Sequence, residues 1–188
     1  MKWLVLLAVI FVCKTGNAQY NPVSNEDFIN AVSKLVVDSN FSHYYLSSNE
    51  APCSFKKFDY DEWYKYALTE DVPIYILNEL AKKSFIDNAP LNWQQQKLQH
   101  AFCIDDTKAK EMLAWPAKRH VKNAAVSPGE DKVVFYFSRP VFTNDNQYAI
   151  IDMGYRCDDL QCGMGAIFLF RQLNGKWKIA GRKLVWGN

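Results

Sequence analysis

The amino-acid sequence predicts an α+β fold in which N-terminal helices pack on a C-terminal antiparallel sheet. Apolar residues recur at helical spacing in the first half of the chain, whereas the last third alternates with a period of two. Short, turn-rich connections separate the strand-like segments, as between neighbouring antiparallel strands. Once an export segment is removed, about 170 residues remain, a length that suits one domain.

The N-terminus predicts export. An apolar run from Trp3 to Val12 is followed by Gly16 and Ala18, which form the small-x-small pattern that signal peptidase requires. The run is about ten residues long, and a membrane-spanning helix needs roughly 20. We therefore expect residues 1–18 to be a signal peptide and residues 19–188 a single domain, periplasmic or secreted, with no integral membrane segment after cleavage.

Cysteine and charge within this segment support the same interpretation. Cys13 follows bulky residues instead of the small residue of a lipobox, which argues against a lipid anchor. Lys2 and Lys14 would be removed with the signal, so the 22 basic residues fall to the number of acidic residues, 20. Nucleic-acid binders usually carry a clear basic excess, so no nucleic-acid partner is expected.

Helical signals fill the first half of the chain. Ser24 with Asp27 resembles a capping box before an amphipathic run, and Pro73 lies in the first turn of the segment with the clearest helical pattern. The predicted helices cover 24–36, 59–68, 71–84 and 105–115, and segment 92–104 fits either a helix or a strand.

The last third predicts strands at Val133–Ser138, Gln147–Tyr155, Gly165–Gln172 and Lys176–Trp186. Asn174-Gly175 is typical of a tight hairpin turn between the last two. Successive short connections predict a four-stranded antiparallel meander with the helices on one face, an outline similar to cystatin-like or NTF2-like sheets.

The segment from Val133 to Ile179 also resembles a group of uncharacterised exported proteins from Bacteroidetes-type bacteria. The shared features are a Ser-x-Pro-x-Phe segment, an alternating strand, a cysteine-glycine loop and an "nGkWk" hairpin. They are carried here by Ser138, Pro140, Phe142, Cys157, Cys162, Gly163, Asn174, Gly175 and Trp177. Asp158 and Asp159 stand where that group has a Cys-Gly step. The resemblance implies export and fold, and it implies no activity.

Four cysteines remain after processing, and an even number in an exported chain indicates two disulfides with three connectivities. The simplest pairs Cys157 with Cys162 and Cys53 with Cys103. No metal or cofactor is predicted, because zinc ligands usually occur in paired short spacings and the histidines lie far apart in sequence. The Cys-x4-Cys spacing also lacks the Cys-x-x-Cys setting of redox catalysts.

A small hydrolase is the alternative to a binding protein, although the sequence contains none of the common catalytic motifs. There is no Gly-x-Ser-x-Gly elbow, P-loop or His-Glu-x-x-His sequence. A small exported hydrolase could instead use His100 with Asp105, Asp106 or Asp152. Asp152 lies in the middle of an apolar strand, where a buried carboxylate would need a partner such as Arg156 or Arg171; on an exposed face it would be ordinary polar alternation.

Binding is the preferred hypothesis. The helical half contains more Tyr and Trp than one core face needs, Trp63 among them, and exposed rings can form a glycan or peptide platform. Asp158 and Asp159 at a hairpin tip, and Arg171 in a basic C-terminal stretch, are further candidates. The sequence thus predicts an exported, disulfide-stabilised binding or interaction module with a protein or glycan ligand and no catalytic role.

Overall fold

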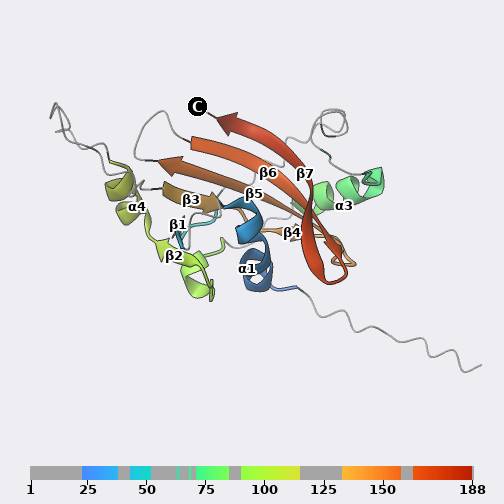
Figure 1. The fold of residues 1–188 in the computed structure, drawn as a ribbon, viewed down its shortest axis with the longest axis horizontal. Helices are drawn as coiled ribbons and strands as arrows, with labels where there is room; N and C mark the ends of the chain where they lie inside the picture. Colours follow the sequence, from blue (N-terminus) through green and yellow to red (C-terminus); the bar gives the residue numbers. More distant parts are fainter. Residues whose placement is uncertain are drawn as a thin grey trace, which may run out of the picture.

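The protein is built around one mixed sheet of seven strands with helices beside it (Figure 1). The computed structural model describes residues 23–37, 43–51, 63, 68, 71–84, 90–114, 133–157 and 163–187. The strand order is β2-β1-β3-β5-β6-β7, and β4 pairs with β5 outside this path. The long strands β5, β6 and β7 run side by side, with α3 near one end of the sheet and α4 near the other (Figure 1).

The four predicted strand segments all form strands, but the predicted sheet is wrong. They are β3 (Val133–Phe137), β5 (Tyr148–Cys157), β6 (Gly163–Leu173) and β7 (Lys176–Gly187). Their neighbours pair antiparallel, as local turns dictate. The sheet is nevertheless mixed and seven-stranded, so the four-stranded antiparallel meander and its cystatin-like or NTF2-like outline do not describe it.

Two short strands convert the meander into a mixed sheet. Strand β1 (Tyr44–Ser47) pairs parallel with both β3 and β2 (Ala101–Ile104). Segment 92–104, for which the sequence allows a helix or a strand, contains both: a 3-10 helix, η3 (Trp93–Gln95), precedes β2. Strand β1 was not predicted: four residues carry little local pattern, and parallel pairing joins segments distant in sequence.

Strands β3 and β4 (Val141–Phe142) lie along the same side of β5, separated by a bulge. Phe137 pairs with Met153 and Val141 with Ile150, so the β3–β4 side has one extra residue. The interruption contains Pro140, which has no N–H to donate to the ladder.

The hydroxyl of Ser138 compensates for part of this break. It accepts a hydrogen bond from the Asp152 N–H at 2.9 Å, while the Ser138 N–H donates to the Asp152 carbonyl at 2.9 Å. The side chain thus replaces a backbone acceptor at the bulge, which keeps the middle of β5 hydrogen-bonded.

Two of the three described α-helices begin where the sequence predicts. Helix α1 (Asn25–Val36) is capped by Ser24, whose hydroxyl oxygen accepts from the Asp27 N–H at 3.0 Å. Helix α4 (Asp106–Leu113) is capped by Asp105, which accepts from the Lys108 N–H at 2.8 Å. Helix α3 (Ile74–Ser84) begins three residues later than predicted, so Pro73 precedes the helix instead of lying in its first turn. The predicted helix over 59–68 lies largely outside the described residues.

The predicted placement of helices on a single face is also wrong. Helix α1 buries Phe28, Ile29 and Val32 against one face of the sheet, together with Ile151 and Phe168. Helix α3 buries Ile76, Leu77, Leu80 and Ala81 against the other face, together with Ile150 and Leu169. Successive residues of β5 and β6 point to opposite faces. Both faces are therefore largely apolar, and each needs a cover.

The β6–β7 turn confirms the predicted hairpin. Asn174 and Gly175 have φ values of 51° and 74°, the left-handed conformations that a type I′ turn requires at both central positions. Glycine adopts this conformation without steric cost, and asparagine tolerates it better than most residues.

Candidate functional site

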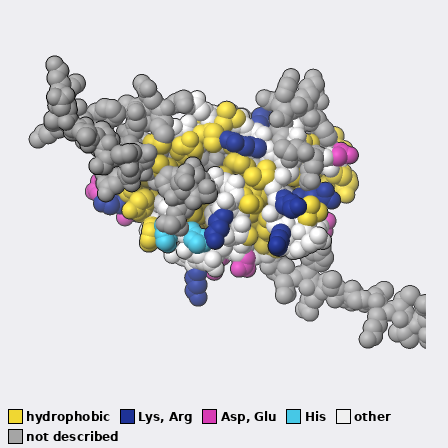
Figure 2. All heavy atoms as spheres, viewed as in Figure 1, with side chains coloured by type: hydrophobic (Ala, Val, Ile, Leu, Met, Phe, Trp, Pro, Cys, Tyr) yellow, Lys and Arg dark blue, Asp and Glu magenta, His cyan; other side chains and the backbone are white. Residues whose placement is uncertain are grey.

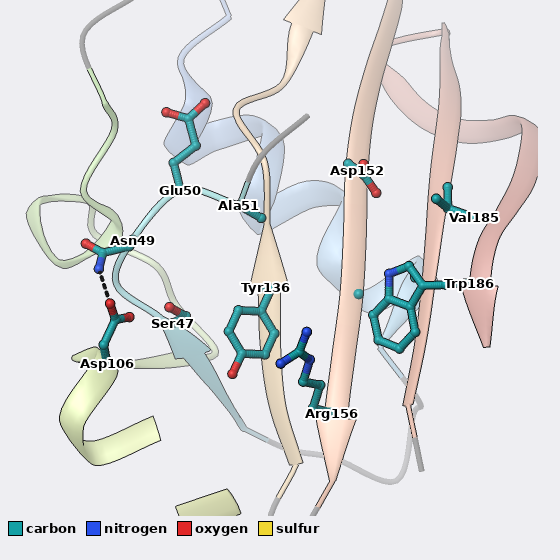
Figure 3. A pocket seen from close by; sticks show the side chains of 12 residues that line it. Ser47, Asn49, Glu50, Ala51, Asp106, Tyr136, Asp152, Arg156, Val185 and Trp186 are labelled. Carbon is teal, nitrogen blue, oxygen red and sulfur yellow. Dashed lines mark hydrogen bonds between the residues drawn. The ribbon is translucent and has the colours of Figure 1, made fainter. Parts of the chain in front are cut away.

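A pocket of about 390 Å³ opens on the α3 side of the sheet. Helix α3 covers this face where β5 begins, at Tyr148 and Ile150, whereas the pocket lies further along the strand, at Asp152, Gly154 and Arg156. Its walls come from β1, β3, β5, β6 and β7, and the first residue of α4 closes one side (Figure 3). The volume lies in the range of small-ligand sites, about 300–1,000 Å³.

Glycines form the floor of this pocket. One cross-strand row runs from Tyr136 on β3 through Gly154 and Gly165 to Trp186 on β7. A Cβ at Gly165 would lie 2.6 Å from Cε2 of the Trp186 indole and 2.8 Å from its Cδ1. A Cβ at Gly163 would lie 2.9 Å from its Cζ3. The indole can rest on the sheet only because these positions carry no side chain.

Aromatic rings stand on both sides of Gly154. We call the part of the pocket that is lined by Gly154, Tyr136, Arg156 and Trp186 the slot. The guanidinium of Arg156 lies between the two rings (Figure 3), 5.7 Å from the Tyr136 centroid and 5.9 Å from that of Trp186. Cation–π contacts with both rings restrict the position of this exposed side chain.

The charges around Tyr136 act on its hydroxyl. Burial raises the pKa of Tyr136 above its ordinary value, the nearby guanidinium of Arg156 opposes that shift, and the carboxylate of Asp106 adds to it. The Tyr136 hydroxyl therefore stays protonated at neutral pH and can donate a hydrogen bond.

Two carboxylates of the pocket hold its wall together. Asp106 accepts a hydrogen bond from the Asn49 amide at 2.9 Å (Figure 3). Glu50 accepts from the Leu91 N–H at 2.8 Å and the Arg139 N–H at 3.2 Å, and forms an ion pair with the Arg139 guanidinium at 3.3 Å. These bonds join the loops after β1 and β3 to the segment before η3, so the two side chains are already engaged.

The structure does not bring the predicted hydrolase residues together. His100 directly precedes β2 and Asp105 directly follows it, so their Cα atoms are about 16 Å apart at the usual rise per residue. The Asp105 carboxylate caps α4. Asp152 lies on β5, which β1 and β3 separate from β2.

Parallel pairing instead brings two histidines together that are distant in sequence. The rings of His43 and His100 lie 6.1 Å apart, and His43 stacks on the exposed Phe102 at 5.1 Å. Within the described part of the chain, no group of three or more His, Cys, Asp or Glu side chains could hold a metal ion.

The cysteines follow the prediction only in part. Cys157 is disulfide-bonded, and Cys162, its predicted partner, lies outside the described residues. Cys103 is a free thiol, so its predicted bond to Cys53 is wrong; Cys53 also lies outside the described residues. Cys103 is half-buried on β2, and burial raises the pKa of its thiol. A buried, protonated thiol behaves as a small apolar side chain.

Of the predicted binding residues, the two that the structure describes, Trp63 and Arg171, do not lie in the pocket. Trp63 is fully buried beneath α3 and therefore cannot act as an exposed platform. Arg171 lies 5.6 Å above the ring of Tyr148, at the opposite end of β5 from Arg156. Asp158 and Asp159 lie outside the described residues. Lysines and arginines are scattered among hydrophobic side chains on the face shown in Figure 2.

Sequence reasoning missed the slot itself. The sequence pattern indicates Arg156 only as a partner for Asp152, and Trp186 only as the end of a strand. The available signal is the set of three glycines, Gly154, Gly163 and Gly165, on two adjacent strands in which most other side chains are large. Glycine within a strand often marks close approach of another group.

No family model, curated protein or solved structure matches this chain. Among the described residues, no helix has the length and hydrophobicity needed to cross a membrane.

Proposed function

We propose that the protein is an exported, non-catalytic binding module whose ligand site is the slot. The observation that carries this proposal is the glycine floor between the rings of Tyr136 and Trp186. The exposed part of the Trp186 indole accepts a ring-shaped group, since aromatic faces favour stacked and edge contacts with other rings.

Features of the site support binding in particular. The pocket is open to solvent and has convergent polar groups, as small-ligand sites do. Trp186 is 39% exposed, which leaves part of the indole available while the glycines support the rest. The slot is also built on strands, and strands hold side chains more rigidly than loops do.

Export is supported by the signal-like N-terminus and by the disulfide at Cys157. Disulfides persist in oxidising compartments and are rare in the cytosol. The slot lies near the end of β5 that carries this bond, since Arg156 directly precedes Cys157.

A ligand screen by NMR tests the proposal on the mature chain. The probes are monosaccharides, uronic acids, small aromatic acids and short peptides, and the signal followed is the indole N–H of Trp186, assigned with Trp186→Phe. We expect one of these classes to shift that signal and Trp186→Ala to abolish its binding. Tyr75→Ala is the matched control, because Tyr75 is an exposed aromatic residue on α3 outside the pocket. Binding that survives Trp186→Ala would contradict the proposal.

A further inference from the structure

The guanidinium of Arg156 determines what the slot can recognise. No ion pair joins it to another described residue, and it contacts the rings of Tyr136 and Trp186. A guanidinium offers five N–H donors in a planar fork that matches the two oxygens of a carboxylate. Two rings already restrict this group, so less conformational entropy is lost when it binds an anion.

Three carboxylates also line the pocket. The charge of Glu50 is balanced by Arg139, whereas Asp106 keeps its charge and is held by a hydrogen bond from Asn49. Asp152 lies four residues from Arg156 on the same strand face, about 13 Å away at the usual rise per residue. That distance exceeds the screening length of about 8 Å at physiological ionic strength, so the attraction of Arg156 dominates at its own end of the slot.

The shape of the slot specifies the rest of the ligand. Gly154 supplies a flat floor, and a Cβ there would lie 3.4 Å from Cζ2 of the Trp186 indole. The Arg156 guanidinium lies beside the Trp186 indole (Figure 3), so a ring stacked on the exposed part of that indole would reach the guanidinium with a group at its edge. The acidic group must therefore be attached directly to the ring or one atom away from it.

We propose that the slot binds a six-membered ring that carries a carboxylate, with the ring on the exposed part of the Trp186 indole and the carboxylate on Arg156. This inference rests on the proposed binding function of the same pocket. Two sources share the chemistry: a uronic acid unit of an acidic polysaccharide, and a small aromatic acid. A peptide would instead bind through backbone groups along an extended segment.

The test compares matched acidic and neutral ligands by calorimetry on the mature chain. The pairs are methyl glucuronide with methyl glucoside, and benzoate with benzamide. We expect the acid of at least one pair to bind at least tenfold more tightly than its neutral partner, and its affinity to fall with added salt. The pair that shows this difference identifies the source.

Variants separate this inference from the binding function. Arg156→Gln should weaken the acid at least tenfold and leave the neutral partner unchanged, and Arg156→Lys should restore only part of the affinity because it lacks the planar fork. Arg182→Gln is the matched control: Arg182 lies over Phe168 on the α1 side of the sheet, 5.4 Å from the ring, and its loss should change nothing.

The outcomes are distinguishable. If neutral and acidic ligands bind with equal affinity, and that affinity depends on Trp186 but not on Arg156, the carboxylate inference is overturned and the binding function stands. If a peptide alone binds, and it needs Trp186, the inference also fails. If no ligand depends on either residue, both proposals fail.

Discussion

Replacing Gly165 with alanine should displace the indole of Trp186. The new Cβ would stand 2.6 Å from Cε2 and 2.8 Å from Cδ1 of the ring, and nearer still to Nε1. Cβ atoms do not approach other atoms this closely in folded proteins, so the ring must leave the floor. The backbone at Gly165 does not have a positive φ, so alanine itself introduces no backbone strain there.

The cost follows from the area that the ring would expose. Full burial of a large apolar side chain contributes about 1.5–3 kcal/mol, and Trp186 is 39% exposed, so about 1–2 kcal/mol is at stake. The loss of chain entropy that glycine imposes on a strand offsets up to about 1 kcal/mol of this. We therefore expect a net loss of about 1 kcal/mol, or about 2–4 °C in Tm for a chain of this length.

A double-mutant cycle measures the effect by thermal and urea unfolding. In a Trp186→Ala background, Gly165→Ala should become neutral or stabilising by about 0.5–1 kcal/mol, because the clash is gone and the entropy gain remains. Gly187→Ala is the control, since a Cβ there would meet only Leu184 at 3.9 Å. If Gly165→Ala costs the same stability with and without Trp186, the glycine-floor reasoning is refuted.

Two further predictions concern stability. Glu50→Gln removes the partner of Arg139 and weakens the acceptor of Leu91, and should cost about 1–2 kcal/mol by urea unfolding; an unchanged midpoint would mean that this network contributes little. Burial raises the pKa of Tyr44 from 10.0 to about 12, so folding favours the protonated phenol, and stability should fall by up to about 1.4 kcal/mol per pH unit between pH 10 and 12. Tyr44→Phe should reduce the loss of stability per pH unit by the same amount, as measured by urea unfolding across the alkaline range. An identical slope in both proteins would contradict the assignment to Tyr44.

The features that the sequence predicted well are those that local chemistry determines. The caps at Ser24 and Asp105 act on N–H groups three residues away, and the turn at Asn174-Gly175 depends on the φ values of its own residues. The alternating period of β7 places Trp177 in the core with polar neighbours outside. None of these features depends on the rest of the chain.

The sheet could not be predicted in the same way. Strand β1 is only four residues long, and its partners β2 and β3 begin at Ala101 and Val133. Such parallel pairing leaves no turn signal in the sequence. The second covered face has a similar origin: the apolar run of β5 from Tyr148 to Ile151 is buried on both sides, whereas a strand with one solvent-exposed face should alternate.

The position of Trp186 explains why the slot could not be found from periodicity. The β6–β7 ladder pairs Ala166 with Leu184 but Gly165 with Trp186, so Val185 is an extra residue. Leu184 is paired with a residue of the α1 face, and simple alternation from there would place Trp186 on that face too. The bulge at Val185 reverses the alternation and turns the indole to the α3 face, above the glycines. Bulges often re-aim a side chain beside a functional site, and this one creates an aromatic wall that no repeat in the sequence encodes.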